Sequence, residues 1–405
     1  MSTTTDIPPK QSFRLEQLIY DTRYRSMTIQ VVTLVLVCLG IGYLYINLMT
    51  NLGNLGLEPD YGFLKSRAGY DIGTTLIDYD SADTHGRAAV VGILNTLLVA
   101  VLGCVTATII GVLAGVLRLS KNWIVSRLTA VYVEGFRNVP LLLWILLIYA
   151  VMTESMPQPR DFREGGIAAM KLFDTVAVTN RGVYIPGPVW GQYSLILVGV
   201  FVLSVIGAFV YRSYAKKVLF DTGRLLPMIW PALLIAIVPS ILFYFILGGP
   251  VTLSYPELGG FNFKGGIQIS NPLLALWLAL SLYTGSFIAE IVRAGILAVS
   301  KGQSEAAFAL GMRPQRTMSL VILPQAMRVI IPPLISQFLN LTKNSSLAIA
   351  VGYPDIRATL GGITLNQTGR ALECMLLLGL FYLALSLAIS TVMNIYNNSK
   401  KLAER

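Results

Sequence analysis

The chain has 405 residues, of which 54% are apolar and only 13% are charged, whereas soluble domains carry about 25% charged residues. Together with a mean hydropathy of +0.65, this composition excludes an ordinary soluble domain and indicates a protein that crosses a membrane several times. The formal net charge of +10 would suit a nucleic-acid partner, but the distribution of the charges along the chain gives it another explanation.

Eight stretches of about 20 mostly apolar residues are long enough to cross a membrane as helices. They predict an all-α polytopic fold with about eight transmembrane helices, at 29–49, 89–112, 129–152, 193–211, 226–248, 273–292, 329–350 and 371–395. The first stretch has span length and no small-residue cleavage site after it, so we expect a retained span rather than a signal peptide.

Lys and Arg are concentrated on one side of these spans. If the N-terminus lies in the cytoplasm, the cytoplasmic segments hold 19 Lys and Arg and the outer segments hold 10. Short cytoplasmic loops of membrane proteins are enriched in these residues, so we expect both termini in the cytoplasm. The basic excess is then a topology signal and requires no nucleic acid.

The sequence offers little for metal or covalent chemistry. Its three cysteines, Cys38, Cys104 and Cys374, fall in apolar runs and read as small buried side chains, and His85 is the single histidine. No cluster has metal-ligand spacing, and neither a P-loop nor a Gly-x-Ser-x-Gly elbow occurs. We therefore expect this chain to bind no metal, nucleotide or cofactor, and a membrane-embedded enzyme is disfavoured.

The segment from Ser300 to Gln315, SKGQSEAAFALGMRPQ, lies between two spans but has the signals of a short capped helix. Ser300 and Gln303 match a capping box, Gly311 suits the left-handed position after a helix, and Pro314 suits the first turn of a second helix. We expect two short helices at an angle, with Pro324 opening the next span. The residues alone allow a helix on the membrane surface or a docking element for a partner.

The same segment carries a recognisable order of residues. Glu305 begins E-A-A, which is followed by three residues, Gly311, nine residues, Val321, one residue, and L-P ending at Pro324. This order resembles the EAA loop of permease subunits of bacterial ATP-binding cassette (ABC) importers, where isoleucine is usual at the position of Val321. The runs at 283–312, at 135–143 (GFRNVPLLL) and at 341–351 (LTKNSSLAIAV) are similar to the branch of type I importers for polar or general L-amino acids.

The resemblance covers roughly 88–396 and implies a transmembrane permease domain there. It implies an insertion with additional spans at 153–272 and a cytoplasmic coupling loop at 300–324. Outside this domain we expect a cytoplasmic N-terminal segment at 1–28, an extra span at 29–49, an outer loop at 50–87 and a cytoplasmic tail at 397–405. The insertion is similar to that of the larger members, which serve general or acidic and amide amino acids.

The resemblance also implies the mechanism and the partners. A periplasmic binding protein delivers the amino acid, two permease subunits form the path, and two ATPase subunits bind ATP and Mg outside this chain. We expect the second permease to be a different chain, although a homodimer remains open. In such importers the coupling loop sits in a groove of the ATPase, and the residues that match its contact here are Glu305, Ala306, Ala307, Phe308 and Gly311.

Polar residues inside the spans are candidates for the substrate path, because ionisable groups cost about 2.5–3.5 kcal/mol there on insertion scales. The candidates are Glu134, Arg137, Glu290, Lys343, Asn344 and Ser345. The competing interpretation of Glu290 is a structural pair with Arg293. The competing function is a secondary transporter driven by an ion gradient, which would use the same charges but would need no stiff cytoplasmic helix.

Overall fold

The computed structural model describes residues 20, 22–54, 56, 59–163, 165–224 and 226–399. The predictions for most of the N-terminal segment at 1–28 and for most of the tail at 397–405 therefore lie outside the described residues. The chain divides into two units, Met1–Gly62 and Phe63–Arg405. The first contains one long helix, α2 (Thr22–Asn54), whose apolar side chains are exposed along its length, as expected for a single span.

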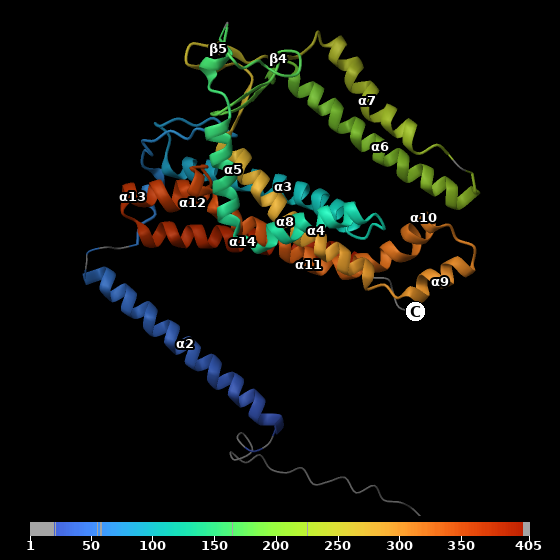
Figure 1. Cartoon of the computed structure of the whole chain (residues 1–405). Coiled ribbons are helices and arrows are strands. Elements are labelled where there is room, and N and C mark those ends of the chain that lie inside the picture. Colours follow the sequence, from blue (N-terminus) through green and yellow to red (C-terminus); the bar gives the residue numbers. More distant parts are fainter. Residues whose placement is uncertain are drawn as a thin grey trace, which may run out of the picture. The chain divides into compact units, whose positions relative to one another are not determined.

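The second unit is built around a central helix, α8 (Asn271–Leu297), which is buried along much of its length. Four other helices contact it directly (Figure 1): α3 (His85–Leu117), α4 (Trp123–Asn138), α5 (Leu141–Ser155) and α11 (Leu323–Asn344). A further helix, α14 (Ala371–Ser399), packs on α11. Helices α3 and α8 come close at Gly111, where an added Cβ would lie 2.5 Å from the Cβ of Ile288. Small residues allow such close contacts in a bilayer.

The prediction of membrane-crossing helices is confirmed, with one change at the third span. Among the described residues, seven helices are long and apolar enough to cross a membrane, and 123–155 forms an eighth candidate only as a bent pair. The expected continuous span at 129–152 is wrong, because α4 and α5 meet at 108°. Val139 adopts an extended backbone since Pro140 disfavours the helical conformation in the residue before it.

The expected insertion at 153–272 contains a helical hairpin, α6 (Ser194–Thr222) and α7 (Ile229–Ile246), flanked by short strands. A three-stranded antiparallel sheet joins β1, β2 and β7, and two ladders pair β3 with β4 and β5 with β6. Register partners in β2 and β7 include Ile185 with Ile267. The bounds are η2 (Pro159–Phe162), β1 (Ala177–Thr179), β2 (Gly182–Ile185), β3 (Gly187–Trp190), β4 (Val251–Ser254), β5 (Glu257–Gly259), β6 (Asn262–Lys264) and β7 (Ile267–Ser270).

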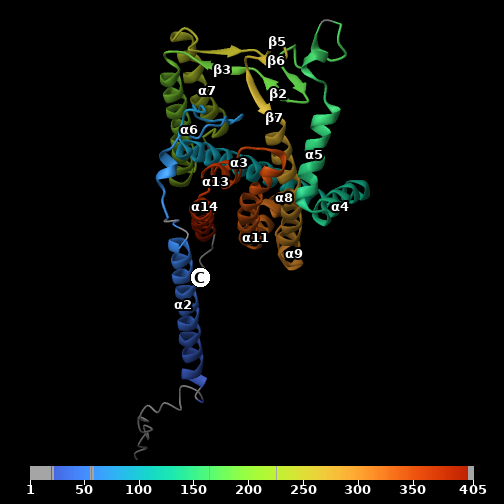
Figure 2. The ribbon, with the colours of Figure 1, turned by 90° about the vertical axis from the view of Figure 1, so that its left-hand side faces the viewer.

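Strand β7 leads directly into the N-terminus of α8, and α9 follows the C-terminus of α8. We therefore call the two ends of the membrane core the strand end and the α9 end (Figure 2). At the strand end, the chain between α11 and α14 forms four short helical segments, and η1 (Gly62–Lys65) lies before α3. These four segments are η4 (Ser345–Val351), α12 (Ile356–Ala358), η5 (Thr359–Thr364) and α13 (Leu365–Thr368). At the α9 end lie α9 (Lys301–Ala309), α10 (Pro314–Thr317) and η3 (Met318–Ile322).

Candidate functional site

The predicted coupling loop is a short helix that ends at a left-handed glycine. Gly311 has φ of 71°, its N–H donates to Phe308 O at 2.9 Å, and Met312 N–H donates to Ala307 O at 3.1 Å. These two bonds form the Schellman arrangement that closes a helix C-terminus. Because L-residues rarely adopt this conformation, Gly311 fixes the direction in which the chain leaves α9.

The start of α9 differs from the prediction. Ser300 occupies the N-cap position, but its side chain makes no capping hydrogen bond, so the expected capping box is wrong. The carboxamide of Gln303 instead accepts a hydrogen bond from Gln325 Nε2 at 3.1 Å. This side-chain bond ties α9 to the first turn of α11, which explains why Gln303 is not available to cap its own helix.

The second helix of the loop is also different. Pro314 begins α10 as predicted, but α10 continues through a π-helical turn, η3, into α11. Residues Pro314–Val351 therefore form one long helical span candidate, and Pro324 does not open a separate helix. The chain after α10 is therefore continuously helical as far as Val351.

The five predicted coupling residues differ in their exposure to solvent. Glu305, Ala306 and Gly311 are exposed, and Phe308 is 51% exposed although it is a large apolar side chain. Ala307 is buried against its own chain. The outward surface of α9 therefore offers one aromatic side chain, one carboxylate and a small residue, while Ala307 serves packing.

Three of the predicted path residues come together at the α9 end of the core. Arg118, at the end of α3, pairs with Glu290 of α8 and, through Nη2, with Glu134 Oε1 of α4 at 3.0 Å. Arg293 Nη2 lies 2.7 Å from Glu290 Oε1, and Arg137 Nη1 lies 4.0 Å from Glu290 Oε2. We call these five residues the ionic cluster.

The ionic cluster joins three helices. Glu134 and Arg137 are three residues apart, yet each pairs with another helix, while Glu290 and Arg293 do form the expected pair within α8. The guanidinium carbon of Arg137 lies 5.2 Å from the ring centroid of Phe287, within cation–π range. The cluster thus holds the end of α4 against α3 and α8.

The other predicted path residues lie on a different helix. The α-helical part of α11 ends at Asn344, and Ser345 begins the 3-10 segment η4. Lys343 is exposed, Asn344 is half-buried and Ser345 is buried. Ser345 Oγ donates to Thr342 O at 2.7 Å, which satisfies this hydroxyl within its own helix.

Lys343 lies on an exposed face of α11 that is apolar at 329–333 and polar from Ser336 to Lys343. Between 329 and 343 the exposed residues recur every three or four positions, so they share one side of the helix. They are Val329, Pro332, Pro333, Ser336, Asn340 and Lys343. Within the described part of the chain, Lys343 forms no ion pair. The polar part of this face, at Ser336, Asn340 and Lys343, is unsuited to lipid and marks a surface that meets water or another protein.

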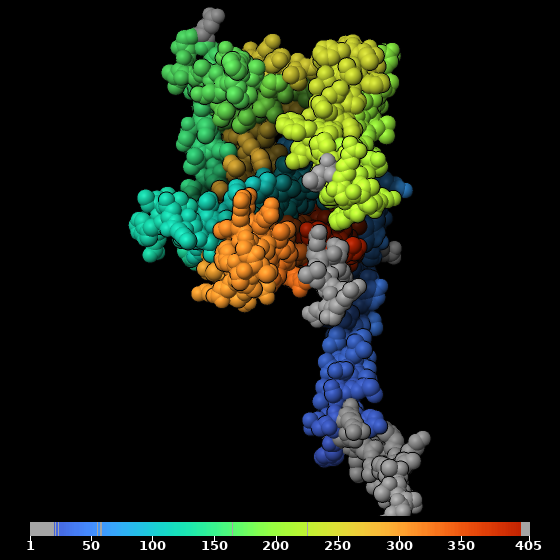
Figure 3. All heavy atoms as spheres, turned by 90° about the vertical axis from the view of Figure 1, so that its right-hand side faces the viewer, coloured from blue at the N-terminus to red at the C-terminus, as the bar shows by residue number. Residues whose placement is uncertain are grey.

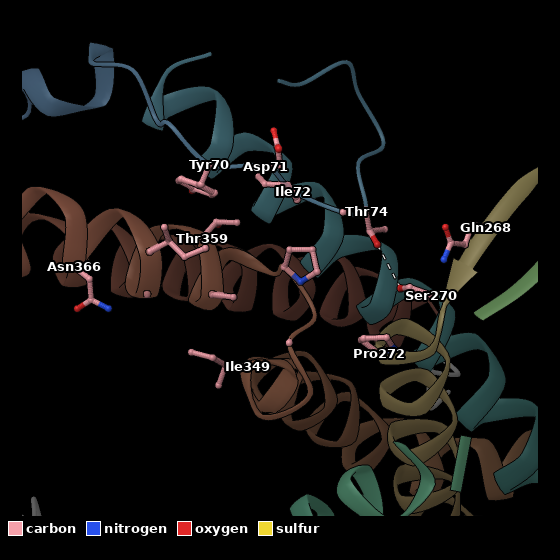
Figure 4. Close-up of a pocket in the computed structure, with 16 residues that line it drawn as sticks. Tyr70, Asp71, Ile72, Thr74, Gln268, Ser270, Pro272, Ile349, Thr359 and Asn366 are labelled. Atoms are coloured by element: carbon pink, nitrogen blue, oxygen red, sulfur yellow. Dashed lines mark hydrogen bonds between the residues drawn. The ribbon is translucent and has the colours of Figure 1, made fainter. Parts of the chain in front are cut away.

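A pocket of about 720 Å³ opens at the strand end of the core (Figure 4). Its walls come from the segment before α3, from the start of α8 and from the segment between α11 and α14. Thr74 Oγ1 and Ser270 Oγ, 3.4 Å apart, join two of these walls. The lining includes Tyr70, Asp71, Thr74, Gln268, Ser270, Ile349, Thr359 and Asn366.

A buried carboxyl group supports one wall of this pocket. Asp355 follows the lining residue Pro354 and is fully buried. Its Oδ1 accepts from Ala358 N at 2.8 Å, but Oδ2 has no hydrogen-bond partner among the described residues. Burial raises the pKa of Asp355 to about 7, against the opposing effects of backbone N–H groups and of Arg357. This carboxyl therefore titrates near neutral pH.

Sequence reasoning missed Arg118 and Asp355. Arg118 lies just beyond an apolar stretch, where a basic residue is expected as a topology signal. Asp355 lies in a segment expected to be an ordinary outer loop. In the described residues no group of three His, Cys, Asp or Glu side chains could hold a metal ion.

Comparisons with known proteins agree with these features. Residues 205–401 match the model of the family "binding-protein-dependent transport system inner membrane component". The chain is 54% identical, over 98% of its length and 99% of the other chain, to the glutamate/glutamine/aspartate/asparagine transport system permease protein BztB of Rhodobacter capsulatus. It is 44% identical, over 97% and 96%, to the general L-amino acid transport system permease protein AapQ of Rhizobium johnstonii. GltK of Escherichia coli O6:H1, a glutamate/aspartate import permease, is 30% identical over 54% and 87%.

Proposed function

Because this chain belongs to the family of inner-membrane components of binding-protein-dependent transport systems, we propose that it carries acidic and amide L-amino acids. It is a multi-pass permease subunit of an amino-acid ABC importer. The range of substrates is proposed from BztB, which is named for glutamate, glutamine, aspartate and asparagine and resembles this chain over nearly all its length. In the proposed orientation both termini lie in the cytoplasm of a bacterium.

The single observation that carries the mechanism is the form of α9. A helix closed by Gly311, tied to α11 through Gln303 and Gln325, presents the half-exposed ring of Phe308 at one end of the core. Such a helix transmits displacement, whereas a flexible loop would absorb it. We assign Phe308 as the anchor in an ATPase groove, Glu305 as the acceptor for a basic group of the ATPase, and Ala306 as the residue that permits close approach.

The exposed polar face of α11 lines the proposed substrate path. Its polar residues, from Ser336 to Lys343, lie on the same continuous helix that begins at α10, next to α9. The Lys343 ammonium group supplies the charge that attracts the carboxylates of an acidic amino acid. The ionic cluster, whose charges are paired with one another, positions α4 and does not bind substrate.

The proposed partners follow from this arrangement. Two ATPase subunits bind ATP and Mg, a second permease of different sequence faces α11, and a periplasmic binding protein delivers the amino acid at the strand end. This chain itself binds no cofactor in the proposal. The experiment is to tag the chain, solubilise the membranes gently and identify the proteins that co-purify. An ATPase with a second permease supports the proposal, and an ATPase with this chain alone supports a homodimer.

The absence of an ATPase from a sample that still transports amino acids would overturn the proposal in favour of transport driven by an ion gradient. A variant tests the coupling residue directly. Phe308→Ala should lower uptake about ten-fold or more while the amount of protein in the membrane stays unchanged. Phe220→Ala is the matched control, because Phe220 is an exposed ring at the end of α6. Equal uptake by both variants would remove Phe308 from the coupling contact.

A further inference from the structure

The α6–α7 hairpin is a module of its own within the inserted segment. Its helices pack chiefly on one another, and the β3–β4 ladder joins their two ends at the strand end of the core. At the opposite end, Tyr211 Oη donates to Pro227 O at 2.9 Å and closes the connection between the helices. In Figure 3 the hairpin, in yellow-green, forms part of the visible surface.

A groove lies between the two helices near this closed end. It has a volume of about 250 Å³. Ala208 and Ala232 line it and are almost fully buried between the helices, so their small side chains leave the space that larger residues would fill. All the other lining residues but one are apolar: Val205, Phe209, Met228, Ile229, Leu233 and Ala236. The exception is Arg212, whose side chain is exposed.

The closed end of the hairpin has the charges and aromatic residues of a membrane interface. Arg212 is followed by three more exposed cations, Lys216, Lys217 and Arg224, and by a single acid, Asp221. Within the described chain, none of these five side chains forms an ion pair. Trp230 is 75% exposed on the neighbouring turn of α7. Trp and cationic residues gather where a span meets the headgroups of lipids.

From this geometry we propose that the groove binds one anionic phospholipid. An acyl chain occupies the apolar groove, and the phosphate lies against the guanidinium of Arg212. Two N–H groups of a guanidinium match two oxygens of a phosphate, and basic pockets between membrane helices suit anionic headgroups. The proposal does not depend on which solute the protein carries.

Other occupants fit the groove less well. A helix of another protein is about 10–12 Å across with its side chains, so one turn of it occupies about 420 Å³ or more, which exceeds the 250 Å³ of the groove. Free phosphate would use Arg212 but would leave the eight apolar lining residues uncovered. A zwitterionic lipid would fill the groove, but its positive headgroup would be repelled by Lys216 and Lys217.

The test uses the purified full-length protein with the subunits that co-purify, in mild detergent. Equal amounts of phosphatidylglycerol and phosphatidylcholine with the same acyl chains are added, and the lipids retained are counted by native mass spectrometry. We expect phosphatidylglycerol to be retained about five-fold more than phosphatidylcholine, the factor that one cation contributes. Adding inorganic phosphate should not displace it.

Two variants assign the lipid to this groove. Arg212→Gln should remove the preference for phosphatidylglycerol, and Ala236→Leu, which fills the groove with an apolar side chain, should reduce retention of both lipids. Arg127→Gln is the matched control, since Arg127 is an exposed arginine on α4 without an ion pair in the described chain. Equal retention of the two lipids, no effect of either groove variant, or displacement by phosphate would overturn the proposal.

Discussion

The ionic cluster and Lys343 are charged groups of the same membrane domain in opposite situations. In the cluster, two carboxylates are shared among three arginines from three helices, whereas Lys343 is exposed on α11 and has no ion-pair partner in the described chain. Removing charges from water costs several kcal/mol unless they are paired. Paired charges therefore hold helices together, while an unpaired one marks a surface that something outside this chain completes.

The exposed faces of α11 and α14 also differ, because one carries polar side chains and the other is apolar. Along α14 the large exposed side chains include Leu376, Leu380, Leu383 and Leu387, a surface that suits lipid. Along α11 the exposed residues include Ser336, Asn340 and Lys343. Exposure in a single membrane chain therefore has two meanings, and the chemistry of the face distinguishes them.

The largest effect is expected from removing the carboxylate that the cluster shares, which tests whether paired charges hold the helices together. Glu290→Ala leaves Arg118 and Arg293 without it, and because these side chains are only half-buried we expect the free energy of unfolding to fall by about 2 kcal/mol. Glu154→Ala, at an exposed carboxylate at the end of α5, is the control and should change it by less than about 0.5 kcal/mol. Chemical denaturation in detergent measures both. Similar stabilities would mean that the cluster does not hold the helices.

Asp355 is a third case, a fully buried carboxyl with one oxygen that has no hydrogen-bond partner among the described residues. Its native pKa of about 7 lies above the ordinary value, so between about pH 4 and 7 the folded protein holds a proton that the unfolded chain releases. Protonated Asp355 therefore contributes to the free energy of unfolding at low pH, and this contribution is lost as the pH rises through about 7. Between pH 5 and 7 we expect a loss of about 2 kcal/mol.

The measurement for Asp355 is the melting temperature of wild type and of Asp355→Asn across pH 5 to 8. The difference between the two proteins isolates this group from the other carboxylates. The wild type should lose stability relative to the variant as the pH rises. Parallel curves would show that Asp355 has an ordinary pKa.

Lys343→Met tests whether the unpaired charge acts in transport rather than in stability. The side chain keeps most of its length and loses its charge, so uptake of glutamate should fall about ten-fold, or about 1.4 kcal/mol of transition-state stabilisation, while the melting temperature stays unchanged. Lys121→Met, in the exposed turn before α4, should transport normally. A lower melting temperature with unchanged uptake would make Lys343 a structural residue.

The smallest expected effect is at the glycine that ends α9. Gly311→Ala places a Cβ at φ of 71° and should cost about 1 kcal/mol, with a partial loss of uptake because the direction of α9 changes. Gly302→Ala lies within α9 with open space around it and should be neutral or slightly stabilising. Uptake assays with quantified membrane levels compare them. Equal behaviour of the two variants would show that the direction set by Gly311 does not matter.

Much of the fold could be predicted because span length and hydropathy are local properties. The apolar runs, the helix at 301–309 and the role of Gly311 follow from such signals. The bend at Pro140 could not be seen in hydropathy, since both arms are apolar, although the proline itself was the signal. The short strands of 177–190 and 251–270 have three or four residues each, too few for a period to show.

The candidate site was predictable in part for the same reason. The EAA order and the charged residues inside apolar runs are visible in the sequence, but their partners are set by packing. Gln303 does not take its predicted part in a capping box, and its side chain bonds instead to Gln325, 22 residues away. Arg118 gained a role because the end of α3 meets α4 and α8.

The pairing of Ile185 with Ile267 also bears on how such a chain could have lengthened. Neighbouring positions on antiparallel strands can be connected by a turn of two residues, so the segment between them leaves and returns at one place. A segment added there has both of its ends held close together by strand pairing that already exists. Closing this loop therefore adds little entropic cost to the folding of the rest of the chain. The α6–α7 hairpin could thus be gained or lost as a unit while the helices around α8 keep their arrangement.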